Sequence, residues 1–103
     1  MINAALMIAA LAAVETGGSV HTGRAGEVGP CQMTPAVVRA FHTPARYIEY
    51  IERELEAHRI EVTPRTVALC WNGGVSAVCG RCIHPATWNY SIRVQNIYDS
   101  LNK

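Results

Sequence analysis

Apolar residues open the chain in one nearly unbroken run. Between Ile2 and Val14 the only polar side chain is that of Asn3. The run is shorter than the roughly 18 apolar residues that span a bilayer, and it lacks the positive charges that precede the apolar part of a secretory signal. Because Ala, Leu and Met favour helices, we expect a central helix, buried on every side, that stops at Gly17-Gly18. The alternative is a signal peptide cleaved after Ala12.

Three Thr-Pro pairs mark predicted helix starts further along the chain. Threonine is a favoured N-cap residue, and proline fits the first helical position because its φ angle is already fixed. The pairs are Thr34-Pro35, Thr43-Pro44 and Thr63-Pro64. They predict helices over about 35–42, 44–58 and 64–71, the last of which stops at Gly73-Gly74.

Apolar spacing extends this picture to a mainly α fold. The 44–58 helix has an apolar stripe opposite a charged face, and the stripe consists of Tyr47, Ile48, Ile51 and Leu55. The same spacing predicts a last helix over about 90–101. Five of the eight glycines lie between Gly17 and Pro30, which predicts a hairpin or loop. We therefore expect a small helical bundle around the central helix, with one short β-hairpin or loop excursion, in a single domain over residues 1–103.

Composition and charge narrow the classes of function. The chain has 103 residues and a net charge of +1, and its nine basic residues are spread from Arg24 to Lys103 without a cluster. This distribution argues against a nucleic-acid partner. The acids are seven glutamates and Asp99, so there are few candidates for a catalytic carboxylate.

Glu15 is the most informative of these acids. It lies in the last turn of the predicted central helix, where burial and the negative end of the helix dipole would both raise its pKa. A carboxyl group kept protonated near neutral pH is what a general acid needs. The alternative is a solvated glutamate at an exposed helix end, which is the commoner case.

Four motifs around and after Glu15 give the chain a family resemblance. They are Glu15-Thr16-Gly17-Gly18, the Gly-Glu-Val-Gly-Pro-Cys-Gln-Met-Thr-Pro segment at 26–35, Ala-Leu-Cys-Trp-Asn-Gly-Gly at 68–74, and Thr87 with Tyr90 and Val94. In this order and spacing the chain resembles lysozyme-like lytic transglycosylases of the soluble-lytic-transglycosylase type, and more distantly goose-type lysozymes. The resemblance runs from about Asn3 to Leu101 and implies an α+β lysozyme-like fold.

The resemblance implies a role for individual residues. Glu15 matches the catalytic general acid and base of the family, and Thr16 stands where serine is usual and keeps the hydroxyl. Gln32 matches a glutamine that hydrogen-bonds sugar in the cleft. Asn72 matches an asparagine that contacts a substrate N-acetyl group, and Tyr90 matches a tyrosine that reaches toward the catalytic carboxyl.

The chain departs from the family pattern at two places. Pro30-Cys31 replaces Leu-Met, which changes the shape of that part of the cleft. Trp71 replaces tyrosine, so it keeps an aromatic wall for substrate and loses the phenol. Trp88 and Tyr90 are further aromatic side chains that can stack on sugar or pack in the core.

The implied reaction is cleavage of the β-1,4 bond between N-acetylmuramic acid and N-acetylglucosamine in peptidoglycan. A single glutamate would act without a cofactor or metal and leave 1,6-anhydromuramyl ends. One alternative is a hydrolytic lysozyme on the same fold, assisted by Glu27, although Glu27 is more typical of a solvated turn. Another is a non-catalytic module that binds glycan or has a structural role. We expect a monomer that acts on the cell wall or in the periplasm after secretion, phage release or virion delivery.

The four cysteines carry a separate signal. Disulfides among Cys31, Cys70, Cys79 and Cys82 are our expectation for a protein that works outside the reducing cytosol. Buried thiols and a zinc site that includes His84 are the alternatives, and the spacing fits no familiar zinc signature.

Overall fold

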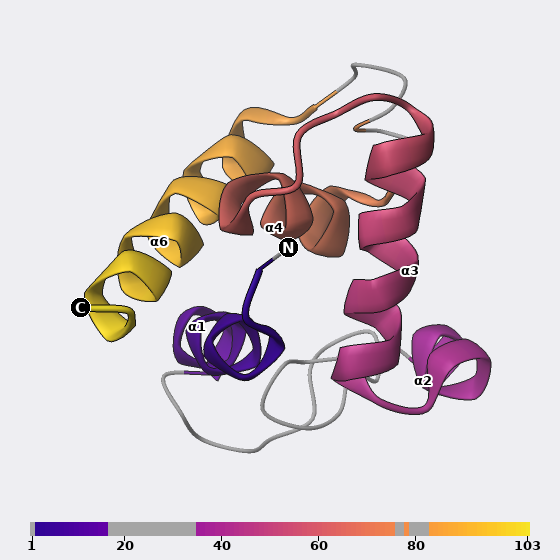
Figure 1. Ribbon diagram of the computed structural model, residues 1–103, viewed down its shortest axis with the longest axis horizontal. Coiled ribbons are helices and arrows are strands. Elements are labelled where there is room, and N and C mark those ends of the chain that lie inside the picture. The colour runs from indigo at the N-terminus through magenta and orange to yellow at the C-terminus, as the bar shows by residue number, and fades with distance from the viewer. Residues whose placement is uncertain (1, 17–34, 76–77, 79–82) are drawn as a thin grey trace.

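Five helices make up most of the described chain in the computed structural model, which describes residues 2–16, 35–75, 78 and 83–103 (Figure 1). They are α1 (Ala4–Thr16), α2 (Pro35–Phe41), α3 (Pro44–Ala57), α4 (Pro64–Gly73) and α6 (Pro85–Leu101). The prediction of a mainly helical fold is confirmed, and these residues contain no strand. The hairpin or loop expected between Gly17 and Pro30 lies outside the described residues.

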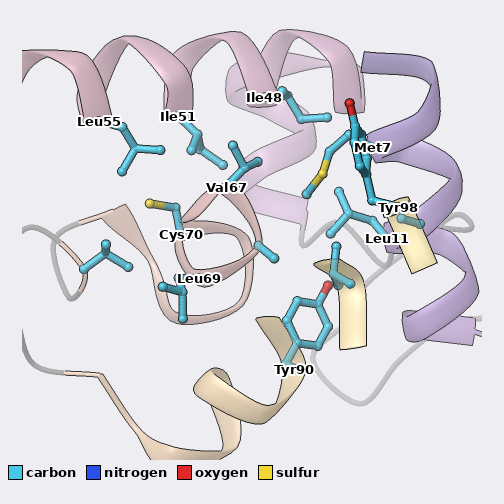
Figure 2. Packing of buried hydrophobic residues seen from close by; sticks show 14 residues of the cluster. Met7, Leu11, Ile48, Ile51, Leu55, Val67, Leu69, Cys70, Tyr90 and Tyr98 are labelled. Atoms are coloured by element: carbon cyan, nitrogen blue, oxygen red, sulfur yellow. The ribbon is translucent and has the colours of Figure 1, made fainter. Parts of the chain in front are cut away.

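The helices pack around one apolar core. The last helix, α6, packs against both α4 and α1, α3 packs against the same two helices, and α2 packs against α3 (Figure 1). Figure 2 shows buried side chains of α1, α3, α4 and α6 gathered in this core. The core consists of Met7, Ala10, Leu11, Ile48, Ile51, Leu55, Val67, Ala68, Leu69, Cys70, Val78, Tyr90, Val94 and Tyr98. No helix in the described ranges is long and apolar enough to cross a bilayer.

Two of the three Thr-Pro predictions are confirmed at atomic detail. The Thr43 hydroxyl accepts from the Arg46 N–H at 3.3 Å at the start of α3. Thr63 forms a capping box with Thr66 at the start of α4, in which each side chain accepts from the backbone N–H of the other. The third pair begins α2 at Pro35 as expected, while Thr34 itself lies outside the described residues.

Glycine ends α4 where the sequence predicts it. The N–H of Gly74 donates to the Cys70 carbonyl at 2.8 Å, and Gly74 has a φ of 87°. That positive φ is costly for a residue with a Cβ, so glycine allows the chain to leave the helix at once. The turn places the last residues of α4 against α6.

The last helix begins five residues earlier than predicted. It starts at Pro85 rather than near Tyr90, because the His84 ring accepts from the Ala86 N–H at 3.0 Å and Pro85 occupies the first helical position. Histidine is not among the preferred N-cap residues, so the sequence pattern did not indicate this start. The added turn carries Thr87, which packs against Gly73 of α4 and is only 6% exposed.

The expectation that the first helix is buried on every side is wrong. Met7, Ala10 and Leu11 are fully buried, whereas the stripe of Ala5, Ala9 and Ala13 is exposed. Alanine exposes little apolar surface and has the highest helix propensity, so it is tolerated on a wet face. An apolar run rich in alanine therefore does not require burial on all sides.

Polar contacts fix the start of α1. The Asn3 side-chain oxygen accepts from the Leu6 N–H at 3.1 Å, which caps the helix. The Asn3 N–H donates to the Tyr98 hydroxyl of α6 at 3.0 Å. The first helix is thus tied to the last one at its N-terminal end.

The capping box of α4 is open to a direct stability test. We expect Thr63→Ala to lower the free energy of unfolding by about 1 kcal/mol, because it removes the acceptor of the Thr66 N–H. Thr63→Ser keeps the hydroxyl and serves as the matched control. Urea denaturation followed by circular dichroism measures the difference, and equal midpoints for Thr63→Ala and the parent would contradict this account of the helix start.

Candidate active site

A hydrogen bond joins the end of the first helix to the last helix. The Tyr90 hydroxyl of α6 donates to Oε1 of Glu15 at 2.7 Å. Glu15 lies half-buried in the last turn of α1, and Tyr90 is 4% exposed. This distance is typical of a well-formed O–H···O hydrogen bond. The contact is the one that the family resemblance implied for these two residues, and their role in catalysis stays a prediction.

A second hydrogen bond joins α4 to the same helix. The Thr87 hydroxyl donates to the side-chain oxygen of Asn72 at 2.8 Å. Because an amide side chain has one acceptor oxygen and one NH₂ donor, this contact orients the amide and leaves its nitrogen to donate to a ligand. Asn72 is exposed, so a ligand can reach that nitrogen.

Close packing reinforces the second contact. A Cβ added at Gly73 would lie 3.1 Å from the Thr87 methyl carbon, which is tighter than ordinary van der Waals contact. Glycine after Asn72 therefore lets α4 approach α6 closely enough for the hydroxyl of Thr87 to reach the amide.

The last helix brings Glu15 and Asn72 to the same region of the structure. Thr87 and Tyr90 are three residues apart, so their side chains project from the same face of α6, one turn from each other. Glu15 and Asn72 bind to these neighbouring positions although 57 residues separate them in the sequence. A carboxyl and an oriented amide are thereby bound to neighbouring turns of α6.

Aromatic packing fixes Trp71, the neighbour of Asn72. Its ring lies 4.9 Å from that of Tyr47 on α3, at an interplanar angle of 49°. Burial raises the pKa of the Tyr47 phenol above its ordinary value, and Cys70 and Tyr50 nearby add to the shift. Tyr47 therefore stays neutral at physiological pH. Trp71 is half-buried, and its position next to Asn72 suits the aromatic wall that the sequence predicts.

The structure bears on the two alternatives for Trp88 and Tyr90, stacking on sugar or packing in the core. Tyr90 is too deeply buried to stack on a sugar, and it contributes its hydroxyl instead. Trp88 is 39% exposed, but the Arg65 guanidinium lies over its ring at 4.7 Å from the centroid. This cation–π contact lies between α4 and the outer side of α6, so Trp88 is not part of the candidate site.

Other predicted site residues fall outside what the structure describes. The backbone of Thr16 belongs to α1, and its side chain is not described. Gln32, the candidate sugar ligand, and Glu27, the candidate second carboxylate, lie outside the described residues. Their predicted roles stay predictions.

The remaining described acids lie on other surfaces. Glu49, Glu52, Glu54 and Glu56 belong to α3, and Glu61 lies exposed in the connection between α3 and α4. Asp99 of α6 accepts from the Gln95 amide at 2.9 Å. Within the described ranges, no three His, Cys, Asp or Glu residues are grouped so that they could hold a metal ion. Cys70 is fully buried in the core, and the other three cysteines lie outside the described residues, so the disulfide prediction is untested.

The sequence pointed to Glu15, Asn72 and Tyr90 as candidates but missed the hydrogen bond from Thr87 to Asn72. In the sequence, Thr87 is notable only because it precedes Tyr90 at the spacing of the fourth motif. Its role depends on the turn of α6 between Pro85 and Tyr90, which His84 and Pro85 start. The His-Pro pair resembles the Thr-Pro pairs elsewhere in the chain and is the signal that could have extended the helix.

Comparisons with protein-family models, with curated proteins and with solved structures gave no match to the chain. The description of the site therefore depends on its own geometry.

The Glu15–Tyr90 contact can be measured through stability. We expect Tyr90→Phe to lower the free energy of unfolding by about 1.5–3 kcal/mol at mildly alkaline pH, where Glu15 is charged, because the ring stays in place and only a hydrogen bond to a charged group is lost. In Glu15→Gln the same change should cost less, because the acceptor is neutral. Urea denaturation of the four proteins in this double-mutant cycle gives the coupling energy, and a coupling near zero would contradict the contact.

Proposed function

We propose that the protein cleaves the β-1,4 bond between N-acetylmuramic acid and N-acetylglucosamine in peptidoglycan, as a lytic transglycosylase with Glu15 as its single catalytic carboxyl. The observation that carries the proposal is the pairing of Glu15 with Tyr90 and of Asn72 with Thr87 on one face of α6. These pairs bring the carboxyl and the amide of two separate motifs to neighbouring positions, as a glycosidase of the resembled family requires.

Glu15 is proposed to act first as a general acid. Its carboxyl gives a proton to the glycosidic oxygen while the bond to the anomeric carbon breaks, and the N-acetyl oxygen of the muramic residue supports the developing positive charge. Tyr90 can donate to Oε1 whether the carboxyl is charged or neutral, because a protonated carboxyl keeps one acceptor oxygen. The phenol therefore holds the orientation of the carboxyl through the proton transfer.

In the second half of the reaction Glu15 acts as a base. It takes the proton of the muramic 6-hydroxyl, whose oxygen bonds to the anomeric carbon and closes the 1,6-anhydro ring. Proton and electron pairs balance without a water molecule, and the carboxyl returns to its starting state. Hydrolysis would replace the 6-hydroxyl with water at this step.

Asn72 is proposed to hold the substrate N-acetyl group. Since Thr87 occupies the amide oxygen, the Asn72 nitrogen is presented as a donor, which suits a carbonyl acceptor on the ligand. Trp71 supplies an apolar surface next to it. Thr16 and Gln32 keep their expected roles as sugar ligands, and an α+β lysozyme-like fold with a β excursion between Gly17 and Pro30 remains part of the proposal.

The decisive experiment digests purified peptidoglycan and weighs the released muropeptides. We expect the wild-type protein to release products one water lighter than those of hydrolysis. Glu15→Gln should lower the rate by about 10²–10⁴-fold, the usual contribution of a general acid or base. Glu49→Gln, which changes an exposed carboxylate of α3, is the matched control and should cleave at the wild-type rate.

Each alternative has its own result in this digestion. Products with reducing ends indicate a hydrolytic lysozyme on the same site. No release by the wild type, or equal release by the wild type and Glu15→Gln, would refute the catalytic proposal and leave a non-catalytic glycan-binding module.

Thr87 provides a test of the positioning of Asn72. Thr87→Val keeps the shape that packs on Gly73 but removes the donor to Asn72. We expect kcat/KM to fall about fivefold, mainly through KM, which corresponds to about 1 kcal/mol for one neutral hydrogen bond. Thr87→Ser keeps the hydroxyl and should restore the wild-type value. If Thr87→Val and Thr87→Ser are equally active, Thr87 does not position the amide.

A further inference from the structure

A separate cavity lies between α2 and α3. Its volume is about 500 Å³, within the range of roughly 300–1,000 Å³ that small-ligand pockets occupy. Side chains of α3 at helical spacing form one wall, and Val37 and Phe41 of α2 with Val75 form the rest. This wall consists of Tyr47, Tyr50 and Glu54 of α3 and of His58, the C-cap residue that follows the helix. We call this the α2–α3 cavity.

Aromatic rings give the cavity a continuous apolar surface. The Phe41 ring lies 4.9 Å from the ring of Tyr47 and 4.9 Å from that of Tyr50, tilted by 31° and 40°. Tyr50 is 37% exposed, so a ligand in the cavity can reach its ring. Rings packed this closely leave no gap for a cation between their faces, in contrast to an aromatic cage. They suit instead the flat apolar face of a ring-shaped ligand.

Hydrogen-bond acceptors form the polar edge of the cavity. The His58 Nδ1–H donates to the Glu54 carbonyl at 2.9 Å, which leaves Nε2 of the neutral ring as an acceptor. The Glu54 carboxylate is likewise an acceptor. The Tyr47 and Tyr50 hydroxyls on the same wall can both donate and accept, so a ligand with hydroxyl groups, which do the same, matches this edge.

Charge argues against an anionic ligand. The Glu54 carboxylate lines the cavity, and the lining residues that the structure describes include no Lys or Arg. A wholly apolar ligand is also disfavoured, because it would desolvate the Glu54 carboxylate without replacing its hydrogen bonds.

Aromatic faces combined with acceptors point to a neutral saccharide, and we propose that the α2–α3 cavity is a second saccharide-binding subsite. It adjoins the candidate active site through one shared pair of rings, since Tyr47 lines the cavity and also contacts Trp71 beside Asn72. This inference rests on the proposed function, which makes the substrate a glycan strand. A long strand would then occupy the candidate active site and the α2–α3 cavity at once. The subsite would raise the affinity for long strands over short ones.

Binding of a defined saccharide tests the subsite apart from catalysis. The probe is the tetramer of β-1,4-linked N-acetylglucosamine, added to Glu15→Gln so that the ligand stays intact, and amide NMR signals report where it binds. We expect saturable shifts at Tyr50, Glu54 and His58. Tyr50→Ala should weaken binding there about threefold to tenfold, the value of one aromatic contact.

Matched variants separate binding from folding. Tyr50→Phe keeps the ring and should bind as the parent does, as should Arg53→Ala, whose exposed side chain pairs with Glu49 on α3. Glu54→Gln removes the charged acceptor without changing the packing and should also weaken binding. Circular dichroism of each variant checks the fold.

The outcomes distinguish this subsite from the proposed function. Shifts confined to residues around Trp71 and Asn72 would overturn the subsite and leave the proposed function standing. Tetramethylammonium serves as a cation probe. If it shifts the signals of the cavity residues and the tetramer does not, the saccharide subsite is refuted in favour of a cation site. A third outcome is that the tetramer shifts the signals of the cavity residues while the wild-type protein releases nothing from peptidoglycan. That result would support the subsite and refute the proposed function.

Discussion

Two tyrosine hydroxyls of the last helix hold the two ends of the first helix. Tyr98 accepts from the Asn3 N–H, and Tyr90 donates to Glu15. Residues 3 and 15 are about 18 Å apart along an α-helix, so the two contacts fix both the position and the rotation of α1 on α6. The carboxyl of Glu15 is consequently placed by the register between these helices, and apolar packing of Met7 and Leu11 supports that register from the core side.

The same helix determines where the amide of Asn72 lies. Thr87 and Tyr90 project from one face of α6, so any movement of α6 displaces the partners of the carboxyl and of the amide together. The relation between Glu15 and Asn72 therefore depends on how α1 and α4 each pack against α6. Gly73 contributes by letting α4 approach α6. Rigid helices carrying both groups offer the preorganisation that a catalytic site needs.

Local signals predicted the helices better than the contacts between them. Thr43 and Thr63 predicted the starts of α3 and α4 correctly, because capping depends on residues only a few positions apart. The start of α6 was misplaced because His84 is an unusual cap, and the burial of α1 was overestimated because alanine is apolar yet tolerated on a wet face. The Glu15–Tyr90 pair came from a family resemblance. The Thr87–Asn72 bond, the Arg65–Trp88 contact and the α2–α3 cavity depend on how distant helices pack, which spacing along the chain does not specify.

The bond between Glu15 and Tyr90 also has a consequence for the order of biosynthesis. The two residues are 75 positions apart, one on the first helix and one on the last. During translation the first helix leaves the ribosome long before this phenol is made, so the hydrogen bond cannot form until α6 emerges. A nascent or truncated chain that lacks α6 thus carries Glu15 without the Tyr90 hydroxyl, and the tie between the two helices forms only with the C-terminal helix.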